Sequence, residues 1–376
     1  MDRIIFRGAQ VLLDGRLTET DVRIAQGRID AVGRGLDGGD VVRVEGYLLP
    51  GLIDEHIHGI AGHDTMDGAQ AVLGMARQLV RHGVTSFLPT TMNAGIEPTR
   101  AALAGVAAAM RENADGAGIP GAHMEGSFLC EKYKGAQDAR ANLAPSVENF
   151  SKLTGEDAGI VRLITLAPEL PGAEEFIRWA AGKGIVCSAG HTDASYEQME
   201  QAAQWGVTQV THLFNGMNPL HHRNPGVPGA ALTLPGLSCQ VISDGIHLHP
   251  AAVRLALRAG HALLITDSLQ AADMPDGVYE LGGQKVTVKA GVARIAAGNL
   301  AGSTLTLERA VANAMRFAEL PLGQVAPMAS ARVADSLHLS DRGRIRAGLR
   351  ADLCLLDGAL EAKMTVVGGK ILFERS

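Results

Sequence analysis

Eight short apolar segments alternate with alanine-rich stretches over most of the chain, and this alternation limits the fold more than any other feature. Each apolar segment has the length of a strand, and each intervening stretch is long enough for a helix. Strands separated by helices pair in parallel, and eight such strands can close into a barrel. The sequence therefore predicts an α/β fold of the (β/α)8 TIM-barrel type. The apolar segments begin at positions 48, 85, 121, 162, 185, 209, 240 and 262.

The two ends of the chain have a different texture, in which short strands are joined by tight turns. Asp14-Gly15 and Gln26-Gly27 are residue pairs typical of hairpin turns. The same strand pattern returns near the other end, beginning with the apolar run at 353–356. We predict that residues 1–48 and 342–376 together form one small β-sandwich domain, beside a catalytic barrel domain at residues 49–341.

Composition excludes several classes of partner. A net charge of −6 gives the chain no general attraction to nucleic acid or to an anionic membrane. No apolar run approaches the roughly 18 residues of a transmembrane helix, and no basic-then-apolar leader opens the sequence. The four cysteines form no Cys-x-x-Cys pair, which fits a reduced cytoplasm. We therefore expect a cytoplasmic protein that binds neither nucleic acid nor membrane.

Histidine and carboxylate side chains follow most of the predicted barrel strands. His56 and His58 occupy alternate positions, so both imidazoles of a strand would point to one face. Glu125, His191 and His212 end later strands, and barrel active sites lie at these carboxyl ends. One oxygen and two nitrogen ligands suit a catalytic divalent ion. Each residue alone could be a buried polar group satisfied by hydrogen bonds, but the complete set favours a metal site.

Two further residues are candidates for other roles. Asp267 ends the last predicted barrel strand, where a carboxylate can take a proton from water and return it to a leaving amine. Its alternative role is to cap a helix, which Ser268 could do instead. Arg223 lies in a basic loop, and a guanidinium matches phosphate oxygens in a bidentate manner. The alternative for Arg223 is an ordinary solvated surface residue.

Motifs along the whole chain carry a family resemblance. They are Pro-Gly-Leu-Ile-Asp near 50, His-Met-Glu-Gly at 123–126, Lys-Gly-Ala-Gln at 134–137, Ala-Gly-His-Thr at 189–192, Thr-His-Leu-Phe-Asn at 211–215, Arg-Asn-Pro-Gly at 223–226, Asp-Gly-Ile-His at 244–247, Thr-Asp-Ser at 266–268 and Leu-Ala-Gly-Ser-Thr-Leu-Thr-Leu at 300–307. The segment at 275–283 also matches an insertion typical of the group. In these motifs the chain resembles the N-acetylglucosamine-6-phosphate deacetylases of the amidohydrolase superfamily.

The resemblance implies a metal-dependent hydrolase of amino-sugar catabolism, which converts N-acetylglucosamine 6-phosphate to glucosamine 6-phosphate and acetate. It implies Asp267 as the acid/base and one or two divalent ions per chain, zinc first, with iron, cobalt or manganese as alternatives. Glu125, His191 and His212 would bind the metal, and the His56 and His58 pair favours a second site. The implied substrate contacts are Ala136, Gln137, Asn215, Gly216, Arg223, His247, Leu300, Ala301 and Gly302. The family is usually dimeric, so Arg223 would reach the phosphate in the neighbouring subunit's site.

The chain departs from the family pattern at two positions. Ser127 replaces the proline of the usual Glu-Gly-Pro-Phe sequence, so the backbone φ that proline would fix is free. Gln137 stands where many members have a histidine, which changes the polar partner expected for the substrate carbonyl.

Three other functions are compatible with parts of this pattern. The same reaction on N-acetylgalactosamine 6-phosphate differs only in the configuration at C4. A cyclic-amide hydrolase such as a dihydroorotase usually bridges two metals with a carboxylated lysine, and Glu125 stands at that position here. A non-catalytic sugar-phosphate sensor predicts that the ligands are lost, yet all of them are present.

Overall fold

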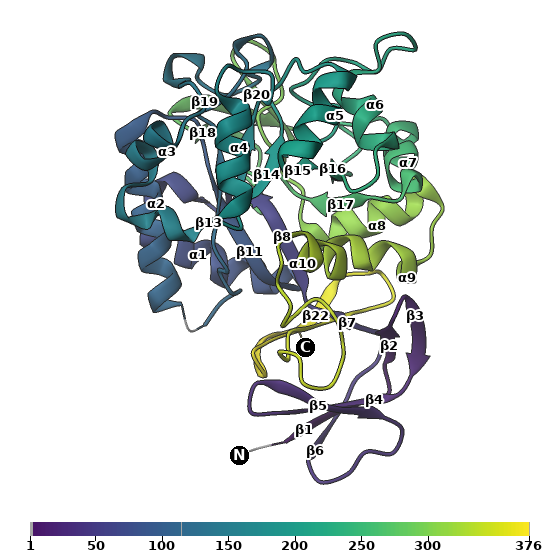
Figure 1. Cartoon of the computed structure of the whole chain (residues 1–376). Coiled ribbons are helices and arrows are strands. Elements are labelled where there is room, and N and C mark those ends of the chain that lie inside the picture. Colours follow the sequence, from purple (N-terminus) through teal and green to yellow (C-terminus); the bar gives the residue numbers. More distant parts are fainter. Residues whose placement is uncertain (1–2, 114, 376) are drawn as a thin grey trace.

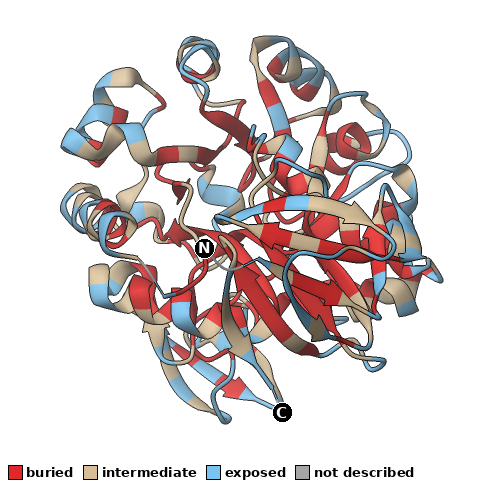
Figure 2. Ribbon diagram, turned by 90° about the horizontal axis from the view of Figure 1, so that it is seen from below, coloured by how far each residue is buried: buried red, intermediate tan, exposed pale blue. Residues whose placement is uncertain are grey.

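The computed structural model describes residues 3–113 and 115–375. A barrel with surrounding helices forms one part of the molecule, and two small sheets lie beneath it, near both chain ends (Figure 1). Figure 2 looks at the molecule from the side of these sheets and shows buried residues along their strands, with exposed residues mainly in outer loops and helices. Segments from the two ends of the sequence therefore share one part of the fold.

Eight parallel strands form the barrel, in the order in which they occur along the chain, which confirms the predicted fold class. The residues along these strands are almost all buried, as expected when helices cover the outside of a parallel sheet. The strands are β8 (Leu52–Ile57), β11 (Val84–Thr91), β12 (Ala122–Glu125), β13 (Val161–Leu166), β14 (Val186–Ala189), β15 (Val207–Val210), β16 (Ser238–Ile242) and β17 (Ala262–Ile265).

The helices between the strands begin and end at residues with clear local signals. Ser195 and Gln198 form a capping box at the start of α5, and Pro250 opens α7. None of the described helices combines the length and the apolarity that crossing a bilayer requires. The main helices are α1 (Ala69–Leu79), α2 (Ile96–Glu112), α3 (Val147–Thr154), α4 (Ala173–Gly182), α5 (Tyr196–Trp205), α6 (Gly226–Thr233), α7 (Pro250–Ala259), α8 (Leu307–Ala318), α9 (Leu322–Val325) and α10 (Ala331–Ser336).

The barrel closes between its last and first strands just beyond the end of β17. The amide of Asp267 donates to the carbonyl of His56 at 2.9 Å, and the amide of His58 donates to the carbonyl of Ser268 at 2.9 Å. Below these bonds, the Thr266 hydroxyl donates to the buried Asp54 carboxylate at 2.6 Å. Residues at the two ends of the barrel sequence are thus held side by side by backbone hydrogen bonds.

The first predicted barrel segment divides between two sheets. Its beginning forms β7 (Tyr47–Pro50), which pairs antiparallel with β21 (Leu353–Leu356), and only β8 enters the barrel. Gly51 is the single residue between them. The prediction of a strand at Leu48 is therefore correct, but the first residues of this segment belong to the end sheets and not to the barrel.

Two sheets built from both chain ends pack around a small core that includes Phe6, Val11, Leu48 and Leu353. Asp14-Gly15 and Gln26-Gly27 form turns with positive φ between paired strands, as predicted. The division into two domains at residues 48 and 342 stays a prediction. The strands are β1 (Ile4–Arg7), β4 (Asp21–Ala25), β5 (Arg28–Gly33) and β6 (Asp40–Arg43) in one sheet, and β2 (Gln10–Leu13), β3 (Arg16–Glu19), β7, β21, β22 (Ala362–Val367) and β23 (Lys370–Glu374) in the other.

A three-stranded antiparallel sheet is inserted between β17 and α8. It consists of β18 (Gly277–Leu281), β19 (Gln284–Lys289) and β20 (Val292–Ile295). The sequence analysis noted a family insertion at 275–283 but did not predict these strands. Figure 1 shows this small sheet at the rim of the barrel, on the side opposite the end sheets.

We predict that Gly51→Ala destabilises the fold, because a Cβ atom at this position would lie 2.1 Å from Thr85 Oγ1, and Thr85 is fully buried. Overpacking of this kind costs about 1–3 kcal/mol, and urea denaturation measures it. Gly358→Ala is the matched control, since a Cβ atom there has no neighbour within 4 Å. Equal unfolding midpoints for the two variants would contradict the prediction.

Candidate active site

A cavity of about 320 Å³ opens at the carboxyl ends of the barrel strands. Most of the predicted metal and substrate residues line it, together with side chains from the long loops above the barrel. The cavity therefore lies where an α/β barrel places its active site. The lining residues that the sequence analysis did not name are Met92, Gly135, Phe214, Leu281 and Asn299.

Glu125 lies at the centre of the histidine cluster. Its Oε1 atom is 3.3 Å from His191 Nε2 and 3.0 Å from His212 Nε2. Its Oε2 atom accepts a hydrogen bond from Gln137 Nε2 at 2.7 Å. Glu125 ends a barrel strand, and His191 and His212 each lie two residues beyond one, so the parallel register brings them to one rim.

His56 and His58 form a second group around the same carboxylate. Their Nε2 atoms are 3.3 Å apart, and His58 Nε2 lies 3.2 Å from Glu125 Oε2. Asp267 Oδ1 lies 3.3 Å from His58 Nε2 and 3.5 Å from His56 Nε2. The structure therefore brings the five predicted metal residues and the predicted acid/base into one contiguous cluster.

The outer nitrogen of each of these four histidines has its own acceptor. Each Nδ1 atom faces a carbonyl oxygen and therefore carries a proton, so Nε2 is the nitrogen that a bound cation can use once any proton on it has left. The pairs are His56 with Gln240 Oε1 at 3.0 Å, His58 with the Thr90 carbonyl at 3.2 Å, His191 with the Tyr133 carbonyl at 2.8 Å, and His212 with the Asn215 carbonyl at 3.0 Å.

Three cluster residues adopt left-handed backbone conformations that residues other than glycine rarely adopt. The φ angles of His191, His212 and Asp267 are 48°, 28° and 49°. Such conformations cost on the order of 1–3 kcal/mol each and persist only where the surrounding structure imposes them. At these strand ends, the backbone turns sharply and directs each side chain into the cavity instead of continuing the barrel wall.

The cluster keeps its carboxylates ionised. Burial raises the pKa of Glu125, but the charge of His56 and the hydrogen bonds from His191 and His212 hold that pKa well below its usual range. Burial lowers the pKa of His58, but its hydrogen bonds with Asp267 and Glu125 raise it to about 10. Carboxylates that stay charged at neutral pH suit a site for a positive ion, and a metal ion that binds beside His58 displaces the proton held there.

The donor set fits a divalent metal. The Nε2 atoms of His191 and His212 lie 3.1 Å apart, and two lone pairs at that distance repel unless a proton or a cation lies between them. In two groups, one ligand atom from each residue lies within 4.8 Å of the others. The groups are Glu125 with His191 and His212, and Glu125 with His56 and His58. The described residues therefore form a site able to bind a divalent metal.

A buried amide network beneath His56 was not found from the sequence. Gln240 Oε1 faces His56 Nδ1, and Gln240 Nε2 donates to Glu55 Oε1 at 3.1 Å. Gln209 Nε2 donates to the other oxygen of Glu55 at 3.3 Å. These glutamines lie inside barrel strands, and their only sequence signal is a polar residue in an otherwise apolar segment.

The predicted substrate residues separate into two sets. Seven of them line the cavity, and Gln137 also anchors the loop above it by accepting from the amide of Asn93 at 2.9 Å. Ala301 is buried, with its amide bonded to the Ala293 carbonyl, and does not line the cavity. Arg223 is exposed on the loop before α6, also outside the cavity of its own chain. The seven are Ala136, Gln137, Asn215, Gly216, His247, Leu300 and Gly302.

The cavity lining includes no lysine or arginine among the residues that the structure describes. Apart from the proposed metal ligands, the basic side chain in this lining is His247, whose Nδ1 atom lies 2.7 Å from Asp244 Oδ2. Burial lowers the pKa of His247, but the hydrogen bond with Asp244 outweighs this effect and raises it. His247 therefore holds a proton more readily than a free imidazole does, which suits a site for an anionic ligand.

Comparison with known proteins places these features in a family. The amidohydrolase family model matches residues 47–372. An N-acetylglucosamine-6-phosphate deacetylase of Lysinibacillus sphaericus is 36% identical, over 98% of this chain and 97% of that protein. An N-acetylgalactosamine-6-phosphate deacetylase of Escherichia coli O157:H7 is 35% identical over 98% of each chain. A solved Mycobacterium smegmatis N-acetyl-D-glucosamine-6-phosphate deacetylase, an aspartate-to-alanine variant in complex with N-acetyl-D-glucosamine-6-phosphate, superposes with a TM-score of 0.92 and 32% identity, covering 99% of this chain and 100% of that one.

We predict that Gln240→Leu weakens metal binding about 10- to 100-fold, because His56 Nδ1 loses its acceptor and Glu55 loses a donor. Competition with a chelator measures the affinity. Gln204→Leu is the control, since Gln204 is exposed on α5. Unchanged affinity in Gln240→Leu would show that the amide does not orient His56.

Proposed function

This chain belongs to the amidohydrolase family, within the group of N-acetylglucosamine-6-phosphate deacetylases, and we propose that it hydrolyses the acetamide of N-acetylglucosamine 6-phosphate. The products are glucosamine 6-phosphate and acetate. The observation that carries the proposal is the position of Asp267, at the edge of the metal-binding cluster and on the wall of a cavity large enough for a small ligand.

Glu125, His191 and His212 are the proposed ligands of the first divalent ion, and His56 and His58 those of a second, with Glu125 close to both groups. Zinc is the first expectation, while iron, cobalt and manganese accept the same nitrogen and oxygen donors. When bound, such an ion lowers the pKa of water from about 15.7 toward 7 and polarises a carbonyl group.

Asp267 is the proposed acid/base. Burial raises its pKa, but the charge of His56 and the hydrogen bond with His58 lower it below its ordinary value. The carboxylate is therefore ionised at neutral pH, which is the form that can accept a proton from water and then donate it to the departing amine. The bond from its backbone amide to His56 fixes where this transfer occurs. Gln137, already bonded to Glu125, is the proposed amide partner of the substrate.

The phosphate requires a strongly basic partner, and no lysine or arginine is among the described residues that line the cavity. Arg223 is the proposed partner, reaching from the loop before α6 of one subunit into the site of the other subunit of a homodimer. Leu220, on the same loop, is 46% exposed, and Ile246, beside His247, is 41% exposed. Leu220 is four residues from Gly216 and Ile246 is next to His247, both of which line the cavity, so a partner subunit that covers these apolar side chains would lie close to the site. The expected cytoplasmic location stays a prediction.

We predict that Asp267→Asn lowers kcat by about 10²- to 10⁴-fold while the metal content is unchanged, because the amide cannot carry the proton. Acetate release and metal analysis measure the two effects. The wild-type protein should show a higher kcat/KM on N-acetylglucosamine 6-phosphate than on the galactosamine epimer. Near-normal turnover in Asp267→Asn would remove the acid/base role, and the opposite preference would favour the epimeric substrate.

We predict that Arg223→Ala and Asp267→Asn chains complement each other when they are co-assembled. In the mixed dimer, the site with Asp267 intact receives Arg223 from its partner. Half of a random mixture is mixed dimer with one competent site of two, so about a quarter of wild-type activity should return. If Arg223→Ala is inactive alone and mixing restores nothing, the arginine does not act across the dimer.

A further inference from the structure

The inserted sheet β18–β20, here called the flap (residues 277–295), covers one side of the proposed active site. Leu281 at the end of β18 lines the cavity. Gln284 Nε2 donates to the carbonyl of Ala136, on a loop that also lines the cavity. A Cβ atom on Gly282 would lie 3.1 Å from Met92 Cβ, so the flap tip packs closely on the strand-end loop. The flap therefore forms part of the wall around a bound ligand.

Two segments connect the flap to the barrel, and both carry residues of the site. The entering root, residues 267–274, begins with Asp267, and the leaving root, residues 300–308, includes Leu300 and Gly302. Close to the cavity the roots are tied by backbone bonds, since Ser303 N donates to the Asp267 carbonyl at 2.7 Å and Leu269 N donates to the Ser303 carbonyl at 3.0 Å.

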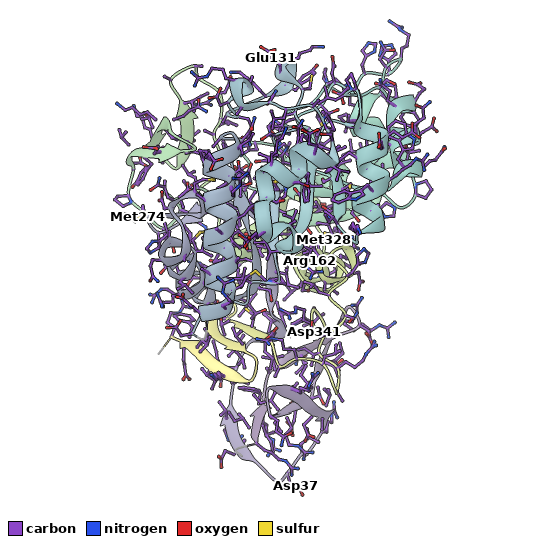
Figure 3. The ribbon with its side chains drawn as sticks, turned by 60° about the vertical axis from the view of Figure 1, so that its left-hand side comes forward. Asp37, Glu131, Arg162, Met274, Met328 and Asp341 are labelled. Atoms are coloured by element: carbon purple, nitrogen blue, oxygen red, sulfur yellow. The ribbon has the colours of Figure 1, made fainter. Side chains whose placement is uncertain are left out.

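One side chain joins the entering root to the end of the leaving root, which is the first turn of α8. His82, which follows α1, lies between Asp273 of the entering root and Glu308 of the leaving root. Its Nε2 atom is 2.5 Å from Asp273 Oδ2, and its Nδ1 atom is 2.8 Å from Glu308 Oε1. In Figure 3, Met274, the residue after Asp273, lies just below the small sheet of the flap. A single imidazole thus bridges both connections at a point outside the cavity.

The two carboxylates have other hydrogen-bond donors, but neither of those donors joins one carboxylate to the other. Gln78 Nε2 also donates to Asp273 Oδ2, and Asp273 has a left-handed φ of 62°. Thr306 Oγ1 donates to Glu308 Oε1, but Glu308 Oε2 is buried without a partner in the described structure. Glu308 is 7% exposed, so His82 supplies the cation that its carboxylate needs.

The bridge carries a positive charge at neutral pH. Burial lowers the pKa of His82, but the hydrogen bonds with Asp273 and Glu308 raise it to about 9. The charged groups that face it are these two carboxylates, with Arg81, Arg309, Glu361 and Arg375 around the adjoining groove. A pKa raised from 6.5 means that the charge stabilises the fold fully below pH 6.5, and that this contribution is lost as the pH rises through about 9.

We propose that His82 is a positioning residue for the deacetylase reaction. His82 holds the two roots of the flap together and so sets the shape of the wall of the substrate-binding cavity. This inference rests on the proposed function. His82 touches none of the cavity-lining residues by a hydrogen bond, and it acts through the roots that carry them. Because Leu281, Leu300 and Gly302 belong to the wall, loosening the roots weakens substrate binding more than it slows the chemical step.

The test compares the wild-type protein with His82→Gln, Asp273→Asn and the double variant. The neutral amide of His82→Gln cannot donate to both carboxylates, so we expect KM to rise about three- to tenfold with kcat changed less than twofold. The double variant should be no worse than the worse single variant, because each change breaks the same bridge. The gap in KM between wild type and His82→Gln should narrow from pH 7 to pH 9.5, as the wild-type imidazole loses its proton.

His261→Gln is the control, because His261 is exposed at the start of β17, away from the roots. A purely structural role predicts a lower Tm and fewer active molecules, with KM unchanged, and that result would overturn the proposal. Independent effects on KM in the two single variants would also overturn it. Hydrogen–deuterium exchange of backbone amides tests the bridge separately from the proposed function. Even if the wild-type protein releases no acetate, His82→Gln should speed exchange in residues 277–295 relative to β21–β23. Equal exchange in the two proteins would refute the bridge.

Discussion

The physical constraint on which the site depends is the convergence of lone pairs at the mouth of the barrel. Four imidazoles give their Nδ1 protons to fixed carbonyl acceptors, so their Nε2 atoms face one another across Glu125 with separations of 3.1 and 3.3 Å. Such an arrangement is costly without positive charge between the rings. The barrel maintains this arrangement because the Nδ1 atom of each ring is hydrogen-bonded to an oxygen of Gln240, Thr90, Tyr133 or Asn215. The selectivity for a cation thus comes from the outer contacts as much as from the ligands.

One hydrogen bond serves both the closure of the barrel and the positioning of Asp267, the proposed acid/base. The amide of Asp267 completes the barrel against His56, while its carboxylate lies 3.3 Å from His58 Nε2. A left-handed φ at Asp267 makes both contacts compatible, because the backbone turns out of the strand at that residue. The Asp267 carboxylate is therefore held by the same contacts that close the barrel, as accurate placement of an oxygen in the proposed reaction requires.

The sequence predicted what parallel strands make regular, and it missed what depends on non-local contacts. His56, Glu125, His191 and Asp267 could be identified because the carboxyl ends of the strands in an α/β barrel gather at one rim. Gln240 was missed because a glutamine within a strand has no local signal, and its role depends on Glu55 from the opposite end of the barrel sequence. The flap is an exception, because its strands pair locally and Gly282-Gly283 between β18 and β19 is a hairpin signal from which they could have been predicted. The segment at Leu48 was assigned to a single sheet because nothing in an apolar run marks a change of partner, which here occurs at Gly51.

The one-residue connection at Gly51 has a consequence for the order in which the chain can fold. Strand β7 is joined directly to the first barrel strand, yet its partner β21 lies some three hundred residues later in the sequence. During synthesis, the edge of β7 that pairs with β21 stays unpaired until the whole barrel sequence has been made. A barrel that assembles as its strands emerge does so before its base is covered. Pairing of β21 with β7 is then a closing step, and the protein acquires its complete set of backbone hydrogen bonds only after the C-terminal strands arrive.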